Sequence, residues 1–103
     1  MSDVVKMLPV AGTVEFEPMI FCPACRRGHV FHVSAINPEN HRWTWNGDRV
    51  KPTFSPSLLV HETEGVGPRC HSVVTGGTIA FQQDCGHEMR GQSAVLGPVP
   101  DEC

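Results

Sequence analysis

The 103-residue chain lacks any run of basic residues, and its formal net charge is −3. Duplex nucleic acid is bound mainly through clustered lysine and arginine, so we do not expect nucleic acid as a partner. No stretch approaches the roughly 20 apolar residues that span a membrane as a helix. Residues 1–12 contain no continuous apolar segment of the kind found in secretory signals. We therefore expect a cytoplasmic protein with no membrane association.

Large apolar residues are also scarce, with only five phenylalanines and two tryptophans. A domain with so small a core often needs a metal ion or disulfides for stability. The five cysteines are an odd number, and thiols stay reduced in the cytoplasm, which favours a metal over a disulfide framework. The ten glycines and nine prolines disfavour long helices. We expect one mostly β domain: a small antiparallel sheet with a zinc knuckle, few or no helices, and loose ends at residues 1–9 and 98–103.

Alternating polar and apolar residues predict several short strands, bounded by turn residues. The clearest is a hairpin with Gly76-Gly77 as its turn, in which Thr75 faces Thr78 and Ser72 faces Phe81. This register places one set of side chains on the inward face: Cys70, Ser72, Val74, Ile79, Phe81 and Gln83. The other predicted strands cover residues 13–17, 29–36, 42–45, 58–60 and 93–96.

The segment Cys22-Pro23-Ala24-Cys25 forms a C-x-x-C knuckle, whose two thiolates can bind one tetrahedral Zn²⁺. The same spacing occurs in redox pairs of the thioredoxin type, but those require a helix that starts at the first cysteine. Here a strand-like segment follows instead. We therefore interpret the pair as half of a structural zinc site, with one zinc per chain.

The second half of the zinc site should come from the late hairpin. Continuing the alternation past Gln83 places Cys85 and His87 on the inward side, close to Cys70. The preferred ligand set is Cys22, Cys25, Cys70 and His87. Cys85 is an alternative fourth ligand, and His71 replaces Cys70 if the register slips by one residue. The remaining histidines are expected to be polar strand or loop residues rather than ligands: His29, His32, His41 and His61.

Three further groups have a functional and a structural interpretation. Trp43 and Trp45, with Asn46 after them, could form an exposed aromatic platform, but core and turn roles are favoured. His71 and Asp84 on the outer face could form a histidine–carboxylate pair, which more often orients a side chain than catalyses. The hydroxyls of residues 53–57 lack the G-x-S-x-G nucleophile motif, so serine hydrolysis is discounted and no catalytic residue is assigned.

Several motifs resemble those of a family of small phage and prophage proteins of unknown function, often labelled automatically as ammonia monooxygenase. The chain carries C-P-x-C at residues 22–25, W-x-W-N-G at 43–47, P-T-F-x-P-S at 52–57, C-H-S at 70–72 and D-C-x-H at 84–87. The resemblance implies that His87 ligates rather than Cys85, because similar sequences can have serine at that position. The monooxygenase label finds no support, because that enzyme is embedded in a membrane.

The resemblance and the zinc site together suggest a zinc-stapled module that binds a host or phage protein in the bacterial cytoplasm; association with the virion is the alternative location. The alternative is a zinc-dependent hydrolase or nuclease, whose metal keeps an open coordination position.

Overall fold

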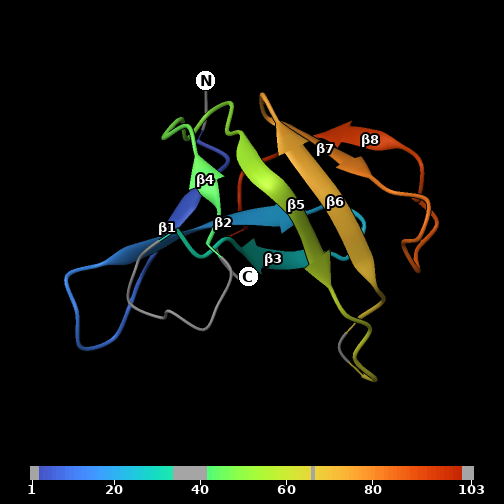
Figure 1. Cartoon of the computed structure of the whole chain (residues 1–103), viewed down its shortest axis with the longest axis horizontal. Coiled ribbons are helices and arrows are strands. Elements are labelled where there is room, and N and C mark those ends of the chain that lie inside the picture. Colours follow the sequence, from blue (N-terminus) through green and yellow to red (C-terminus); the bar gives the residue numbers. More distant parts are fainter. Residues whose placement is uncertain (1–2, 34–41, 66, 101–103) are drawn as a thin grey trace.

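The computed structural model describes residues 3–33, 42–65 and 67–100, and this part of the chain forms eight strands and no helix (Figure 1). The strands form two antiparallel sheets, in the orders β1-β2-β3 and β4-β5-β6-β7-β8. The expected small all-β domain is therefore confirmed. No helix in the described ranges has the length and apolar character that crossing a membrane requires.

The three-stranded sheet contains β1 (Lys6–Pro9), β2 (Phe16–Cys22) and β3 (Arg27–Val30). The expectation of a loose end over residues 1–9 differs from this arrangement, because β1 pairs with β2 along its whole length. Just before it, Val4 and Val5 are buried and their N–H groups donate to the carbonyl of Arg49. The strand predicted at residues 13–17 begins only at Phe16, because Thr13 closes a turn onto Val10.

The five-stranded sheet contains β4 (Thr44–Trp45), β5 (Phe54–Val60), β6 (Cys70–Thr75), β7 (Thr78–Phe81) and β8 (Ser93–Val95). The predicted hairpin register is confirmed, with Thr75 opposite Thr78 and Ser72 opposite Phe81. Gly76 and Gly77 have φ values of 57° and 83°, which a two-residue turn of this kind requires. The inward face is buried as expected except at Gln83, which is exposed because β7 already ends at Phe81.

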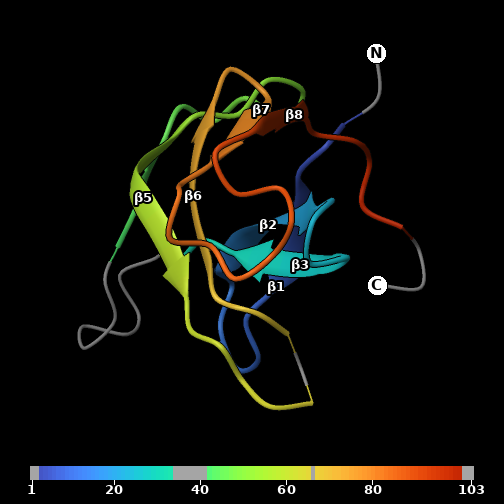
Figure 2. The same cartoon turned by 90° about the vertical axis from the view of Figure 1, so that its right-hand side faces the viewer.

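The two sheets pack against each other, and their strands cross when viewed as in Figure 1 and lie in separate layers in Figure 2. Phe31, which follows β3, stacks on Phe54 of β5 with ring centroids 4.1 Å apart. Ile20 of β2 and Ile79 of β7 are fully buried in the same core. The core therefore brings the end of β2 and the start of β6 together in the interior.

Strand β5 carries an irregularity that matters for the chemistry of the outer face. Its register against β6 shifts between Phe54, which lies opposite Val74, and Leu58, which lies opposite Ser72. Three residues of β5 therefore lie opposite a single residue of β6. Ser57 is the last of the three, and bulges of this kind redirect side chains beside active sites.

Candidate functional site

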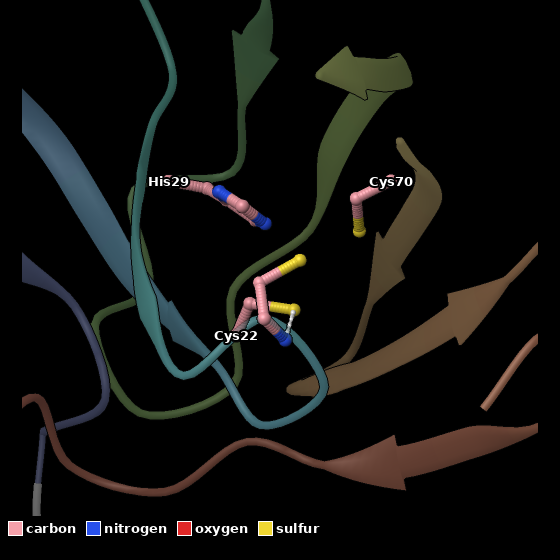
Figure 3. Close-up of side chains that lie close together, drawn as sticks. Cys22, His29 and Cys70 are labelled. Carbon is pink, nitrogen blue, oxygen red and sulfur yellow. Dashed lines mark hydrogen bonds between the residues drawn. The ribbon is translucent and has the colours of Figure 1, made fainter. Parts of the chain in front are cut away.

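Four potential metal ligands converge in the interior between the two sheets. Cys22 ends β2, Cys25 lies in the following turn, and His29 lies in β3. Cys70 begins β6 on the other sheet. The ligand atoms of these four residues all lie within 4.8 Å of one another. Figure 3 shows Cys22, His29 and Cys70 pointing toward one another from separate strands.

The chemistry of this cluster fits a metal ion. Three thiols and one imidazole form a closed donor set of the kind that structural zinc sites use. The Nε2 atom of His29 is buried and has no hydrogen-bond partner in the described part of the chain, as expected for a nitrogen reserved for a metal. The N–H of Cys25 donates to Sγ of Cys22 (3.4 Å), which supports negative charge on that sulfur.

Ionisation of one of the three thiols disfavours ionisation of the other two. The thiol of Cys70, followed by the imidazole of His29 and the N–H of Cys25, lowers the pKa of Cys22 to about 3 despite its burial. The adjacent Cys22 raises the pKa of Cys70, and burial adds to that rise. Burial also raises the pKa of Cys25, with the charge on Cys22 as the second cause. Only a bound cation would allow all three sulfurs to ionise together.

A second group of ligand atoms shares one member with the first. Cys70, Cys85 and His87 also lie within 4.8 Å of one another. Both ring nitrogens of His87 are buried without a described hydrogen-bond partner, and its ring packs edge-on against Phe81 at 4.8 Å. The structure therefore brings the predicted Cys22, Cys25 and Cys70 together. It completes that group with His29, and it places the predicted His87 beside Cys70 and the alternative ligand Cys85.

His29 is the residue that the sequence interpretation missed. It was expected to be an ordinary strand residue, yet it lies in the four-ligand group. The available signal was its position four residues after Cys25, within the same knuckle and the strand that leaves it. No helix follows Cys22 in the described residues, because β3 starts directly after the turn. This context matches the metal knuckle and lacks the helix of a thioredoxin-type redox pair.

A different set of side chains is connected on the outer face of the five-stranded sheet. The hydroxyl of Ser57 lies 3.0 Å from Nε2 of His71. The Nδ1 atom of His71 lies 3.1 and 3.2 Å from the two carboxylate oxygens of Asp84. This serine–histidine–aspartate chain has the connectivity of the catalytic triad of serine hydrolases. The predicted His71–Asp84 pair is therefore present, and it is extended by a serine that the sequence interpretation set aside.

Asp84 is further fixed by Arg69, whose Nη2 donates to Oδ2 at 2.9 Å. The guanidinium of Arg69 is the largest influence and lowers the pKa of Asp84 below its ordinary value; desolvation opposes this shift, and a hydrogen bond from His71 lowers the pKa further. An ionised Asp84 can only accept hydrogen bonds. It therefore places the imidazole hydrogen on Nδ1 and leaves Nε2 free to accept the hydrogen of Ser57.

Strand alternation explains why the two clusters are adjacent but separate. Cys70 faces the interior and the next residue, His71, faces outward, because successive side chains of a strand point to opposite sides. In the turn that follows β7, Asp84 is exposed and the next residue, Cys85, is buried. Sγ of Cys85 lies 3.2 Å from both the backbone nitrogen and the backbone oxygen of His71. The inner cysteine thus fixes the backbone of the outer histidine.

Ser57 was missed because its geometry depends on tertiary structure rather than on a local motif. The G-x-S-x-G motif marks a strand-to-helix turn, and the described part of this chain has no helix. Here the β5 bulge presents the serine instead. The weak signal in the sequence was the predicted outward His71–Asp84 pair, which had no third partner assigned.

The predicted surface residues Trp45 and Asn46 serve the core and a turn. The ring of Trp45 stacks on Phe54, with centroids 5.8 Å apart, and its Nε1 donates to the carbonyl of Asp48. The side-chain oxygen of Asn46 accepts hydrogen bonds from the N–H groups of Asp48 and Thr53. These contacts fit the favoured structural roles. Trp43 differs, because its Nε1 donates to the carbonyl of Ser57 at 3.2 Å.

Comparison with known proteins identifies the family. The family model described as "Bacterial ubiquitination-like system serine protease (BubE)" matches residues 7–82. This match covers most of the chain, so the protein belongs to the BubE family. It includes the knuckle cysteines, Ser57 and His71, and it ends just before Asp84. No curated protein and no solved structure matches the chain.

Proposed function

We propose that this member of the BubE family is a serine protease that hydrolyses an amide bond in a protein of a bacterial ubiquitination-like system. The observation that carries the proposal is the hydrogen-bonded chain from Ser57 through His71 to Asp84, with distances of 3.0 and 3.1 Å. The description of the family as serine proteases supports the same reaction class. A cytoplasmic location and a protein partner are parts of this proposal.

The three side chains divide the reaction between them. Nε2 of His71 accepts the hydroxyl proton of Ser57 while Oγ attacks the carbonyl carbon of the scissile amide. His71 then gives this proton to the leaving amine as the carbon–nitrogen bond breaks, which leaves an acyl ester on Ser57. A water molecule, deprotonated by His71, hydrolyses this ester and restores the serine. Asp84 keeps the imidazole oriented and stabilises its charged form throughout.

We assign the metal centre a structural role. Cys22, Cys25, His29 and Cys70 would hold zinc, which thiolate and imidazole donors suit. When bound, the ion supplies a cross-link between the two sheets and neutralises the thiolates. Four protein donors leave no open position for a substrate, which favours a structural site over a catalytic one. The cross-link fixes the start of β6, where His71 directly follows Cys70.

Neither of the two functions suggested by the sequence alone accounts for both the metal site and the Ser57–His71–Asp84 chain. A zinc-dependent hydrolase would need an open metal, whereas the four-ligand group is complete and mostly buried. A non-catalytic binding module would not require Ser57, His71 and Asp84 to be aligned. The zinc-stapled scaffold of that interpretation is retained here as the support of the protease.

Covalent labelling tests the proposal. A fluorophosphonate probe should modify Ser57 in the zinc-loaded chain, as located by mass spectrometry, because only an activated serine attacks such a probe. Ser57→Ala should abolish labelling and hydrolysis. Ser55→Ala is the matched control, since Ser55 is exposed two residues away in the same segment and should leave both unchanged. Labelling that persists in Ser57→Ala would overturn the proposal.

A further inference from the structure

Within the described residues, strand β5 has an open edge directly beside Ser57. Its neighbour β4 covers only Phe54 and Ser55, so the edge from Ser57 to Val60 has no strand partner in the described part of the chain. The other edge of this segment is paired with β6. An uncovered edge offers unpaired N–H and C=O groups to an incoming extended chain.

The hydrogen-bond pattern shows which groups of this edge are available. The carbonyl of His71 accepts from Gln82 (2.8 Å), and its N–H lies against Sγ of Cys85, so both backbone groups face away from β5. In an antiparallel pair, the residue opposite must then also turn its backbone groups outward. That residue is Leu59. Its N–H and C=O therefore point to the open edge, two residues from the nucleophile.

The side chains around this edge form an apolar recess that continues to the nucleophile. A hollow of about 330 Å³ is lined by Trp43, Pro56, Ser57, Leu59 and His61. Leu59 is 38% exposed and shares the outer face with its neighbour His71. The indole of Trp43 is fixed by its hydrogen bond to Ser57 and by edge contact with Phe31 at 5.7 Å. The recess thus has one rigid aromatic wall and one aliphatic wall.

We propose that the protease binds its substrate as an extended strand along this edge of β5, pairing with Leu59, and places a bulky apolar side chain next to the scissile bond into the recess of Trp43 and Leu59. The inference rests on the proposed function and deepens it by naming the substrate class: an unfolded, extended segment of a protein. Main-chain pairing supplies affinity and the recess supplies sequence preference. A folded loop or helix could not satisfy the backbone groups of Leu59.

The test uses the zinc-loaded full chain and a library of internally quenched peptides that vary one residue at a time around the cleaved bond. Leucine, methionine or phenylalanine at one adjacent position should raise kcat/KM at least tenfold over glycine. A single backbone N-methyl group should lower kcat/KM at least tenfold at one residue and less than twofold at the next, because strand pairing uses alternate amides. Equal effects of N-methylation at successive residues would overturn the proposal.

A variant of the recess adds a test on the enzyme. Leu59→Ala should lower the leucine-to-glycine preference at least fivefold while retaining the strand. Val95→Ala is the matched control: Val95 is an exposed aliphatic residue on β8, 81% accessible, and its loss should leave the preference unchanged. Equal effects of the two variants would contradict the assignment of the recess. Labelling of Ser57 without any apolar preference would refute this inference but leave the proposed function intact, whereas absent labelling would refute both.

Discussion

The inner and outer faces of the β6–β7 hairpin are built to opposite requirements. The inner face places Cys70 among buried thiols that need a cation, in a closed site. The outer face places His71, whose side chain is 29% accessible, between a serine and a carboxylate at the surface. Cys70 and His71 are consecutive residues of β6. A metal-binding residue and a proposed catalytic residue can therefore be neighbours in sequence and still lie on opposite faces of the same strand.

Removing an inner ligand should have the largest effect and should destroy both sites. Cys70→Ala removes the one residue of the four-ligand group that lies in the five-stranded sheet. Structural zinc contributes roughly 10–16 kcal/mol of apparent binding free energy in small domains, which matches or exceeds a typical net stability of about 5–15 kcal/mol. We expect loss of bound zinc, of cooperative thermal unfolding and of Ser57 labelling. A variant that keeps its zinc and its melting transition would contradict this view.

Removing an outer residue should separate function from stability. His71→Ala should lower kcat/KM by a factor of roughly 10⁴ or more, because the base of a serine triad acts as a unit with its nucleophile. Its zinc content and melting temperature should stay close to those of the wild type, since the imidazole is partly exposed. Kinetics and metal analysis on the same preparation check this. Zinc loss in His71→Ala would show that the two faces are not separable.

The two candidate histidine ligands can be distinguished by paired variants. His29→Ala should lower zinc affinity by at least about 10–100-fold, the range already seen for residues that only support a ligand. His87→Ala should retain zinc. Its free energy of unfolding should fall by roughly 0.5–1.5 kcal/mol, because the edge contact of His87 with Phe81 is lost. Competition with a chromogenic chelator measures the first effect, and urea unfolding the second. A larger loss of affinity in His87→Ala would transfer the fourth ligand to His87.

The smallest effect is expected from the pH dependence of the Asp84 ion pair. The pKa of Asp84 is lowered in the folded protein, chiefly by Arg69, so folding favours the ionised form. The stabilisation is present above the ordinary carboxyl pKa of about 4 and is lost as pH falls through the folded value. Arg69→Gln should therefore shift the acid limb of the stability curve to higher pH, as followed by urea unfolding between pH 2 and 7.

Arg49→Gln provides the control for this pH experiment. Arg49 has similar exposure and pairs with Asp3 at 3.5 Å rather than with Asp84. We expect it to leave the acid limb in place. Equal shifts in the two variants would assign the effect to net charge rather than to Asp84.

The sequence predicted features that depend on local alternation. The Gly76-Gly77 hairpin, its register and the outward His71–Asp84 pair follow from a two-residue periodicity and a strong turn signal. The position of Ser57 could not be predicted, because it depends on a bulge and on pairing between β5 and β6. His29 was missed because the late hairpin contains other cysteine and histidine residues that could supply the remaining ligands. Only the packing of the two sheets shows that β3 faces Cys70.

Metal substitution tests most directly whether the inner face supports structure and the outer face performs chemistry. Replacing zinc with Co²⁺ should produce the strong near-ultraviolet absorption of thiolate–cobalt bonds, while kcat for peptide hydrolysis stays within about twofold, since serine chemistry does not pass through the ion. A hydrolysis rate that changes tenfold or more with the identity of the metal, in protein that remains folded, would contradict the account.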